Sequence, residues 1–266
     1  MRHVPLNEYL STKSNWPARL LGWQSYSLTR DEMAVAREYD RDRYEPLLRL
    51  TLDRPEDYKI REFADLGMHM DEPMFISMGE EVFCTTVRTA RMLWYSLIQS
   101  YVERFASGAV CELGCGYGFN LTYLGRNAYG GESSANAVAL GKRLGLDVSP
   151  FNYNHAADYE VIRLGSTVLT VHSIEQIPSA LPIVEHLRQH RHSIKEVINL
   201  EPCWVDERSS WIGMTRNRYN QLVDHNHDLV DAVRRADDVE VVHYEADVFG
   251  LHPLNSTNII VWRFKD

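Results

Sequence analysis

A carboxylate and three glycines stand close together in residues 110–118, Val-Cys-Glu-Leu-Gly-Cys-Gly-Tyr-Gly. Gly114, Gly116 and Gly118 have no Cβ, so the backbone there can turn sharply and approach a ligand closely. The helix start that follows offers free N–H groups and a positive dipole end. The spacing is not the dinucleotide-binding Gly-x-Gly-x-x-Gly, because position 119 is Phe. The segment therefore predicts a strand, a binding turn and a helix.

A second carboxylate, Glu132, follows Glu112 by twenty residues, within the sequence Gly-Gly-Glu-Ser-Ser. A carboxylate that ends a second strand at this distance can accept hydrogen bonds from both hydroxyls of a ribose. Each carboxylate also has a plainer explanation. Glu112 could simply favour the dipole of the following helix, and Glu132 could be a solvated turn residue.

Together the two segments resemble motifs I and II of the class I S-adenosylmethionine-dependent methyltransferases. The family's first motif is acidic-x-Gly-x-Gly-x-Gly, which residues 112–118 match without exception, and Glu132 matches the acidic residue that closes strand two. The resemblance covers about residues 108–265 and implies S-adenosylmethionine as the methyl donor. In the family the glycine turn contacts the methionine part of the donor, and the first acidic residue helps to hold its ammonium. The implied donor contacts in these motifs are Glu112, Gly114, Cys115, Gly116, Gly118, Glu132 and Ser133.

The segment after the predicted third strand is where the family places an adenine contact. Most members have Asp there, and this chain departs from the pattern with Asn152. An amide oxygen can still accept a hydrogen bond from the adenine amino group. Tyr153 could then lie against the purine ring. Because the register is open by one or two residues, Asn154 is a rival to Asn152.

His172 opens a segment after the predicted fourth strand, His-Ser-Ile-Glu-Gln-Ile, that resembles one found in many small-molecule methyltransferases. The resemblance places His172 at the sulfonium-methyl region. It could shape the donor pocket or act as a general base, because an ordinary histidine pKa of about 6.5 suits proton removal at neutral pH. The alternative is a hydrogen-bonded structural histidine. Glu175 is expected to cap the following helix or to hold the loop.

The sequence contains other groups that could take part in catalysis, substrate binding or metal binding, but it supports these roles less strongly. Methyl transfer mainly requires alignment and exclusion of water, so no catalytic dyad is needed. A nucleophilic Cys203 is disfavoured, because in the DNA cytosine methyltransferases the Pro-Cys pair follows strand four, where this chain has His172. The connection 204–219 carries tryptophans and arginines that either border the acceptor pocket or form a solvated loop. His186 and His190 could share a helix face, but no cysteine cluster accompanies them and we expect no metal.

Composition narrows the class of acceptor. The 266 residues include 28 Lys and Arg against 37 Asp and Glu, which gives a net charge of −9. Such a chain is poorly suited to nucleic acid or to anionic lipid, and no run of eighteen apolar residues predicts a membrane span. Four scattered cysteines predict a reducing cytoplasm. A homodimer is compatible with the sequence.

The elements that must position these residues alternate between strands and helices after residue 108. The predicted strands are 109–112, 129–132, 148–152, 168–171, 197–200, 239–244 and 258–264. The predicted helices are 82–105, 120–126, 135–144, 180–189 and one long helix within 217–235. This pattern predicts an α/β, Rossmann-like, mostly parallel sheet with helices on both faces, and the resemblance implies seven strands. The last two strands are expected to be antiparallel neighbours.

Residues 1–80 lack this rhythm and are predicted to form an N-terminal helical cap or lid before a donor-binding core at 81–266. A capping box at 29–32 predicts a helix from Arg30 towards Leu52, interrupted at Pro46.

The sequence thus predicts a methyltransferase that uses S-adenosylmethionine to modify an oxygen or nitrogen of a small metabolite or natural-product peptide. A non-catalytic donor-binding protein and an RNA methyltransferase are the alternatives.

Overall fold

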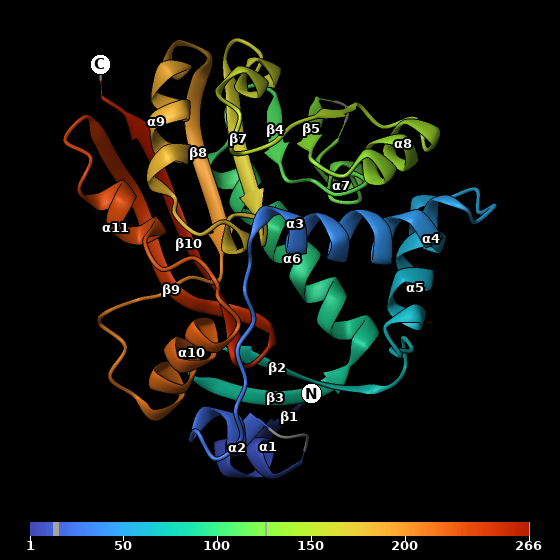
Figure 1. The fold of residues 1–266 in the computed structure, drawn as a ribbon, viewed down its shortest axis with the longest axis vertical. Helices are drawn as coiled ribbons and strands as arrows, with labels where there is room; N and C mark the ends of the chain where they lie inside the picture. Colours follow the sequence, from blue (N-terminus) through green and yellow to red (C-terminus); the bar gives the residue numbers. More distant parts are fainter. Residues whose placement is uncertain (13–15, 126, 266) are drawn as a thin grey trace.

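A mixed sheet of ten strands organises the part of the chain that the computed structural model describes, residues 1–12, 16–125 and 127–265. The strand order is β1-β3-β2-β9-β10-β8-β7-β4-β5-β6. Figure 1 shows β8, β7, β4 and β5 side by side in this order. The parallel half consists of β4 (Val110–Leu113), β5 (Ala128–Glu132), β6 (Val148–Pro150), β7 (Ser166–Val171) and β8 (Ile194–Glu201). The antiparallel half consists of β1 (Arg2–Val4), β2 (Pro73–Met78), β3 (Glu81–Thr86), β9 (Val239–His252) and β10 (Asn255–Phe264).

Two hydrophobic cores lie on opposite faces of the sheet because successive side chains of a strand point in opposite directions. Leu169 of β7 packs in one core with α6 (Val87–Phe105). Val168, its neighbour in β7, packs in the other core with α9 (Leu181–Gln189) and α11 (Leu229–Arg234). The predicted α/β architecture with helices on both faces is confirmed, and so is the antiparallel pairing of the last two strands.

The prediction of a seven-stranded, mostly parallel sheet is wrong, because the described residues contain ten strands and only half of them are parallel. The additional strands β1 and β2 come from residues 1–80, and β3 comes from the start of the predicted helix 82–105; no strand was expected in either place. β9 continues to His252, well past its predicted end, and its far part pairs with β2 through Ser77 and Gly250. β3 occupies positions 81–86, so the helix predicted over 82–105 begins only at Val87.

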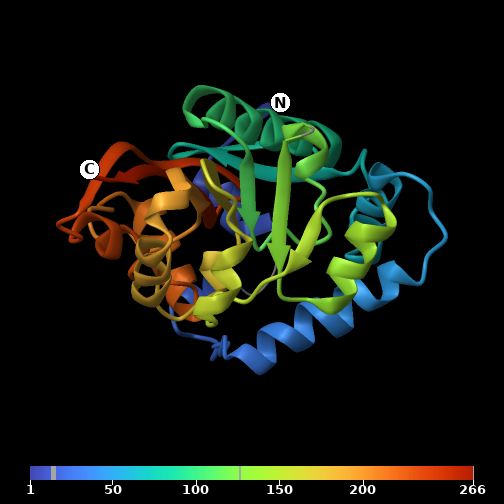
Figure 2. The ribbon, with the colours of Figure 1, turned by 90° about the horizontal axis from the view of Figure 1, so that it is seen from above.

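A continuous helical run over residues 32–48 lies across the carboxyl ends of the parallel strands; we call it the strap. It consists of α3 (Glu32–Ala36), the π-helical segment η1 (Arg37–Tyr44) and α4 (Glu45–Leu48). Figure 2 shows the strap in blue, beyond the arrowheads of β4 and β5. Asp31 caps it by accepting a hydrogen bond from the amide of Ala34 at 2.8 Å, so it begins two residues later than predicted.

The other helical elements connect the strands. Their bounds are α1 (Leu6–Thr12), α2 (Trp16–Leu20), α5 (Pro55–Asp65), α7 (Leu121–Leu124), α8 (Ala135–Arg143), η2 (Ala156–Val161), η3 (Ile174–Gln176), η4 (Arg191–Ser193) and α10 (Trp211–Leu222). The single long helix predicted within 217–235 is wrong: α10 ends at Leu222 and α11 begins at Leu229. Between them Asp224 has a φ of 55°, a left-handed conformation that interrupts a helix. In the described residues we find no helix with the length and apolarity of a membrane span.

The proposed division into a cap at 1–80 and a core at 81–266 stays a prediction. Residue 80 lies in the turn between β2 and β3, two strands of the same sheet. The cap is also not purely helical, because β1 and β2 belong to that sheet.

Candidate active site

A cavity of about 380 Å³ lies where β4, β5 and β7 end, and the strap forms part of its wall. Ligands of open parallel sheets bind at this edge, beyond the carboxyl ends of the strands. The predicted site residues that line the cavity are Glu112, Gly114, Cys115, Gly116, Glu132, Ser133, Tyr153 and His172. Gly118 and Asn152 do not line it.

The glycine turn after β4 needs glycine for both conformation and space. Gly114 and Gly116 have φ values of 73° and 56°, in the left-handed region that other residues rarely adopt. A Cβ on Gly116 would lie 2.6 Å from the hydroxyl oxygen of Tyr44, which comes from the strap. A Cβ on Gly114 would lie 2.4 Å from the Cβ of Ser173. Gly118 instead packs beneath the turn, against side chains that include Leu121.

Glu112 is buried at the end of β4, with 1% of its surface exposed. Its Oε1 accepts a hydrogen bond from the Asn120 side chain at 2.7 Å, whereas its Oε2 has no hydrogen-bond partner among the described residues. Burial raises the pKa of this carboxyl to about 8. A buried acid with one free oxygen is suited to a cationic ligand, because a cation would supply the missing partner and favour the ionised form.

Glu132 joins the two strand ends. Its carboxylate accepts hydrogen bonds from the amides of Gly116 and Ser134, at 2.9 and 2.8 Å, and from the Ser133 hydroxyl at 3.2 Å. The carboxylate therefore holds the glycine turn in place as well as lining the cavity. Cys115 packs closely on β5, since a Cβ on Gly130 would lie 2.5 Å from its sulfur.

A neighbouring cavity of about 330 Å³ continues the first towards the end of β6. Asn152 and Asn154 line this second cavity, and Ser133 and Tyr153 line both. The side-chain amide of Asn152 donates to Glu32 of the strap at 2.6 Å. The Tyr153 hydroxyl donates to the carbonyl of Leu113 at 2.7 Å. The sequence left Asn152 and Asn154 as rivals, and the structure brings both to the same cavity.

His172 lies in a strained loop directly after β7, with a φ of 50°. Its Nε2 is 2.7 Å from the Thr257 hydroxyl, and its ring packs edge-on against Trp94 with centroids 5.0 Å apart. Burial, with a smaller contribution from Arg91, lowers the pKa of His172 to about 3. The imidazole is therefore neutral at physiological pH but far less basic than the sequence suggested.

Glu201, at the end of β8, holds the backbone of this loop. Its carboxylate accepts hydrogen bonds from the amides of Ser173, Ile174 and Glu175, at distances of 3.0 to 3.3 Å. Three such donors fix the loop that carries His172. The sequence marks Glu201 only by its place before Pro202.

Three cations and a carboxylate in the cavity wall were not predicted as site residues: Arg43 of the strap, Lys59 and Glu62 of α5, and Arg91 of α6. Glu62 lies 3.4 Å from Arg43 and 3.5 Å from Lys59. Burial lowers the pKa of Lys59 to about 8 and that of Arg91 to about 10. No motif marks these residues, because only the tertiary structure brings α5 and α6 to the strand ends.

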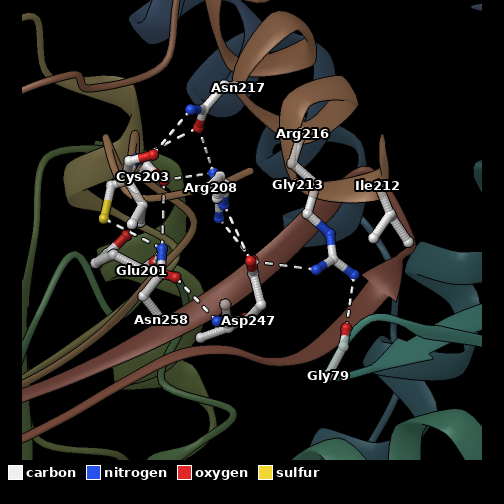
Figure 3. A network of polar contacts seen from close by, with 12 residues as sticks. Gly79, Glu201, Cys203, Arg208, Ile212, Gly213, Arg216, Asn217, Asp247 and Asn258 are labelled. Carbon is white, nitrogen blue, oxygen red and sulfur yellow. Dashed lines mark hydrogen bonds and ion pairs between the residues drawn. The ribbon is translucent and has the colours of Figure 1, made fainter. Parts of the chain in front are cut away.

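Arg208 and Arg216 of the 204–219 connection lie in a separate network, which Figure 3 shows. Arg208 donates to both carboxylate oxygens of Asp247, and Arg216 lies 3.3 Å from the same carboxylate. Arg216 also donates to the carbonyl of Gly79 at 2.9 Å. These arginines are therefore occupied by protein groups, and neither lines the cavity.

Cys203 and the histidine pair also have structural contacts. The Cys203 thiol is buried, and burial raises its pKa to about 12. His186 contacts the carbonyl of Tyr153 at 3.3 Å, and His190 contacts the carbonyl of His186 at 3.0 Å. Among the described residues no group of three histidine, cysteine or acidic side chains is arranged to hold a metal ion.

Comparison with known proteins shows the fold. No family model matches the chain, and no curated protein is similar to it in sequence. Magnesium protoporphyrin IX methyltransferase from Synechocystis PCC 6803 with bound S-adenosylhomocysteine is similar in structure, with a TM-score of 0.53 and 11% identity over 88% of this chain and 100% of that chain. Geranyl diphosphate C-methyltransferase from Streptomyces coelicolor A3(2) has a TM-score of 0.48 and 11% identity, over 68% of this chain and 81% of that chain. The predicted resemblance is confirmed at the level of fold: the chain shares the fold of the magnesium protoporphyrin IX methyltransferase.

Proposed function

We propose that this protein transfers a methyl group from S-adenosylmethionine to an oxygen or nitrogen of a small metabolite or natural-product peptide. The observation that carries the proposal is the buried carboxylate of Glu112, whose Oε2 is without a hydrogen-bond partner in the described chain, beside a glycine turn at the strand ends. An ammonium group placed there would meet an acid that lacks a cationic partner. The fold similarity supports the same ligand.

The residues present fit the donor from one end to the other. Glu112 would hold its ammonium, the turn at Gly114 and Gly116 would pass close to its methionine part, and Glu132 would accept hydrogen bonds from the ribose. In the adjoining cavity, the side-chain oxygen of Asn152 or Asn154 would accept a hydrogen bond from the adenine amino group. The donor supplies a methyl group already activated on a sulfonium.

The protein's own contribution is positioning and exclusion of water. The strap covers the strand ends, and Glu201 holds the loop of His172 rigid. We propose that His172 shapes the methyl-transfer region and accepts a proton only from an acceptor that becomes acidic as it reacts. A pKa of about 3 makes it a weak base towards any other acceptor.

Calorimetry with S-adenosylmethionine and S-adenosylhomocysteine, followed by an assay for S-adenosylhomocysteine release with a metabolite and peptide library, tests the proposal. We expect saturable binding of both compounds and turnover with at least one acceptor. Binding without turnover would leave a donor-binding protein, and absence of binding would reject the proposal.

Gly116→Ala and Gly145→Ala are a matched pair for this assay. Gly116 has a φ of 56° and would direct its Cβ at Tyr44, whereas Gly145 has a φ of 75° with nothing within 4 Å. Both variants carry the backbone strain of alanine in the left-handed region, but only Gly116→Ala changes the cavity. We expect donor binding to be lost in Gly116→Ala and retained in Gly145→Ala.

The proposal extends to cellular location, for which we propose the cytoplasm, and to assembly as a homodimer. The four cysteines, Cys84, Cys111, Cys115 and Cys203, are all unpaired, which supports a reducing cytoplasm. Light scattering on the purified protein tests whether it forms a homodimer.

A further inference from the structure

We propose that Arg43, Lys59 and Arg91 form a subsite for an anionic group of the acceptor, a carboxylate or a phosphate. This inference rests on the proposed methyltransferase function and names the class of acceptor. The three side chains come from three different elements, the strap, α5 and α6, and all line the cavity of about 380 Å³ at the strand ends. Nothing in the sequence groups them.

Glu62 is the only carboxylate among the described residues that forms an ion pair with this group, so three cations share one acid. Lys59 and Glu62 are largely buried, with side-chain exposures of 21% and 7%. The Nε of Arg91 has no hydrogen-bond partner among the described residues. Burying cations with incomplete pairing is costly, and an anion entering the cavity would relieve that cost.

Aromatic rings hold the cations at the cavity wall. The Arg91 guanidinium lies 3.7 Å from the centroid of the Phe63 ring. The Lys59 ammonium lies 5.2 Å from the Phe63 ring and 5.3 Å from the Phe119 ring. These contacts stabilise the cations without neutralising them, so their charge stays available to a ligand. The same rings offer apolar contact to a planar acceptor.

The donor alone does not balance this charge. Its amino-acid end is a zwitterion and its sulfonium is positive, so it brings one net positive charge. Glu112 and Glu132 lie where the donor is proposed to bind and supply two negative charges once ionised. The three cations and Glu62 together carry a net charge of +2. With the positive charge of the donor and the two negative charges of Glu112 and Glu132, one positive charge remains without a counter-charge. Glu175 also lines the cavity, but its carboxyl lies 3.7 Å from His172 and 3.9 Å from His225, and among the described residues it forms no ion pair with the three cations.

Titration of the full-length protein with benzoate, phenyl phosphate and the neutral benzamide, with and without saturating S-adenosylhomocysteine, tests the subsite. We expect benzoate or phenyl phosphate to bind and benzamide to bind at least about tenfold more weakly, as for loss of a charge-assisted hydrogen bond. Lys59→Met and Arg91→Met should reduce anion binding by a similar factor. Arg88→Met is the matched control, because Arg88 is exposed one turn earlier on α6.

Two further titrations decide whether the subsite binds an anionic group of the acceptor or the carboxylate of the donor. S-adenosylhomocysteine carries a carboxylate, whereas 5′-methylthioadenosine lacks the amino-acid end. We expect Lys59→Met and Arg91→Met to bind both compounds like the wild type. A selective loss of S-adenosylhomocysteine affinity would assign the anion to the donor and overturn the proposal, and absence of saturable anion binding to the wild type would overturn it as well. If no donor binds but the anions do, the proposed function fails while the anion subsite stands.

Discussion

Glu112 shows how burial gives one side chain a chemistry that its type does not have in water. Its carboxyl is enclosed at the end of β4, and burial raises its pKa to about 8. In the free protein the acid is therefore mostly protonated at neutral pH, and donor binding should release a proton. The buffer dependence of the calorimetric binding enthalpy measures that release, and Glu112→Gln should abolish it.

The same shift predicts how stability depends on pH. The folded-state pKa of Glu112 lies above its unfolded value of 4.5, so its contribution to stability is complete below pH 4.5 and is lost as the pH rises through about 8. Between pH 6.5 and 8 we expect the free energy of unfolding to fall, by at most about 1.4 kcal/mol per pH unit for this group. Denaturant unfolding of Glu112→Gln should give a flatter profile. Glu103→Gln, at an exposed position of α6, should leave the wild-type slope unchanged.

For His172 the pKa is shifted down rather than up, and this shift gives a separate prediction. Burial and the nearby Arg91 lower its pKa to about 3, so the imidazole should stay neutral from pH 5 to 8. NMR of histidine ring protons, assigned with His172→Asn, should show no titration of His172 in that range. Asn is chosen because it tolerates the left-handed backbone at this position. A midpoint near that of free imidazole would show that the ring is solvated and available as an ordinary base.

At the scale of elements, the Asp40 side chain joins the strap to the start of α8 by several hydrogen bonds. The Asp40 carboxylate accepts hydrogen bonds from the Ser134 hydroxyl at 2.6 Å and from the Asn136 amide at 2.9 Å, at the start of α8. It also accepts from the Asn136 side chain at 3.1 Å. The link joins the strap to the residues that follow Glu132, so the strap is mechanically connected to the carboxylate that we propose to bind the ribose.

Asp40→Ala should loosen the strap. Loss of these charge-assisted hydrogen bonds costs about 2 kcal/mol, which corresponds to more than about tenfold in the opening equilibrium. Hydrogen exchange should therefore be faster over residues 32–48, and donor affinity should fall. Asp42→Ala is the control, because Asp42 has 58% of its side chain exposed and forms only a distant ion pair with Arg37. Equal effects of the two substitutions would contradict this role for Asp40.

At the scale of the whole molecule, Asp247 joins three parts of the chain (Figure 3). It lies in β9, pairs with Arg208 and with Arg216 of α10, and Arg216 reaches the β2–β3 turn at Gly79. The side chain of Arg216 is 1% exposed. The network ties the turn between β2 and β3 to β9 and α10, in the rest of the fold.

Asp247→Asn should destabilise the whole protein by about 3–5 kcal/mol, because it leaves two buried guanidinium groups without a counter-charge. Asn preserves the side-chain shape and tolerates the φ of 57° at this position. Denaturant unfolding measures the loss, and Asp231→Asn, which removes an exposed pair on α11, should cost less than about 1 kcal/mol. A loss below about 1 kcal/mol for Asp247→Asn would show that the network adds little to the fold.

The sequence by itself determined those strands and helices that depend on residue type and spacing within a short segment. The apolar run and glycine turn of 110–118, the second carboxylate at Glu132 and the strand–helix alternation predict the parallel half of the sheet, because burial and backbone freedom depend on residue type and spacing. Eight of the ten predicted donor contacts line one cavity for the same reason: parallel strands end at a common edge.

Only the tertiary structure decided what depends on segments far apart in the chain. β2 joins the sheet because β9 extends far enough to pair with it, and β3 joins through its pairing with β2; no local signal records these partners. Arg43, Lys59 and Arg91 meet through the packing of three elements, and the pKa of His172 falls because its surroundings exclude water. Burial and electrostatic environment are properties of the assembled fold, so residue type alone could not predict them.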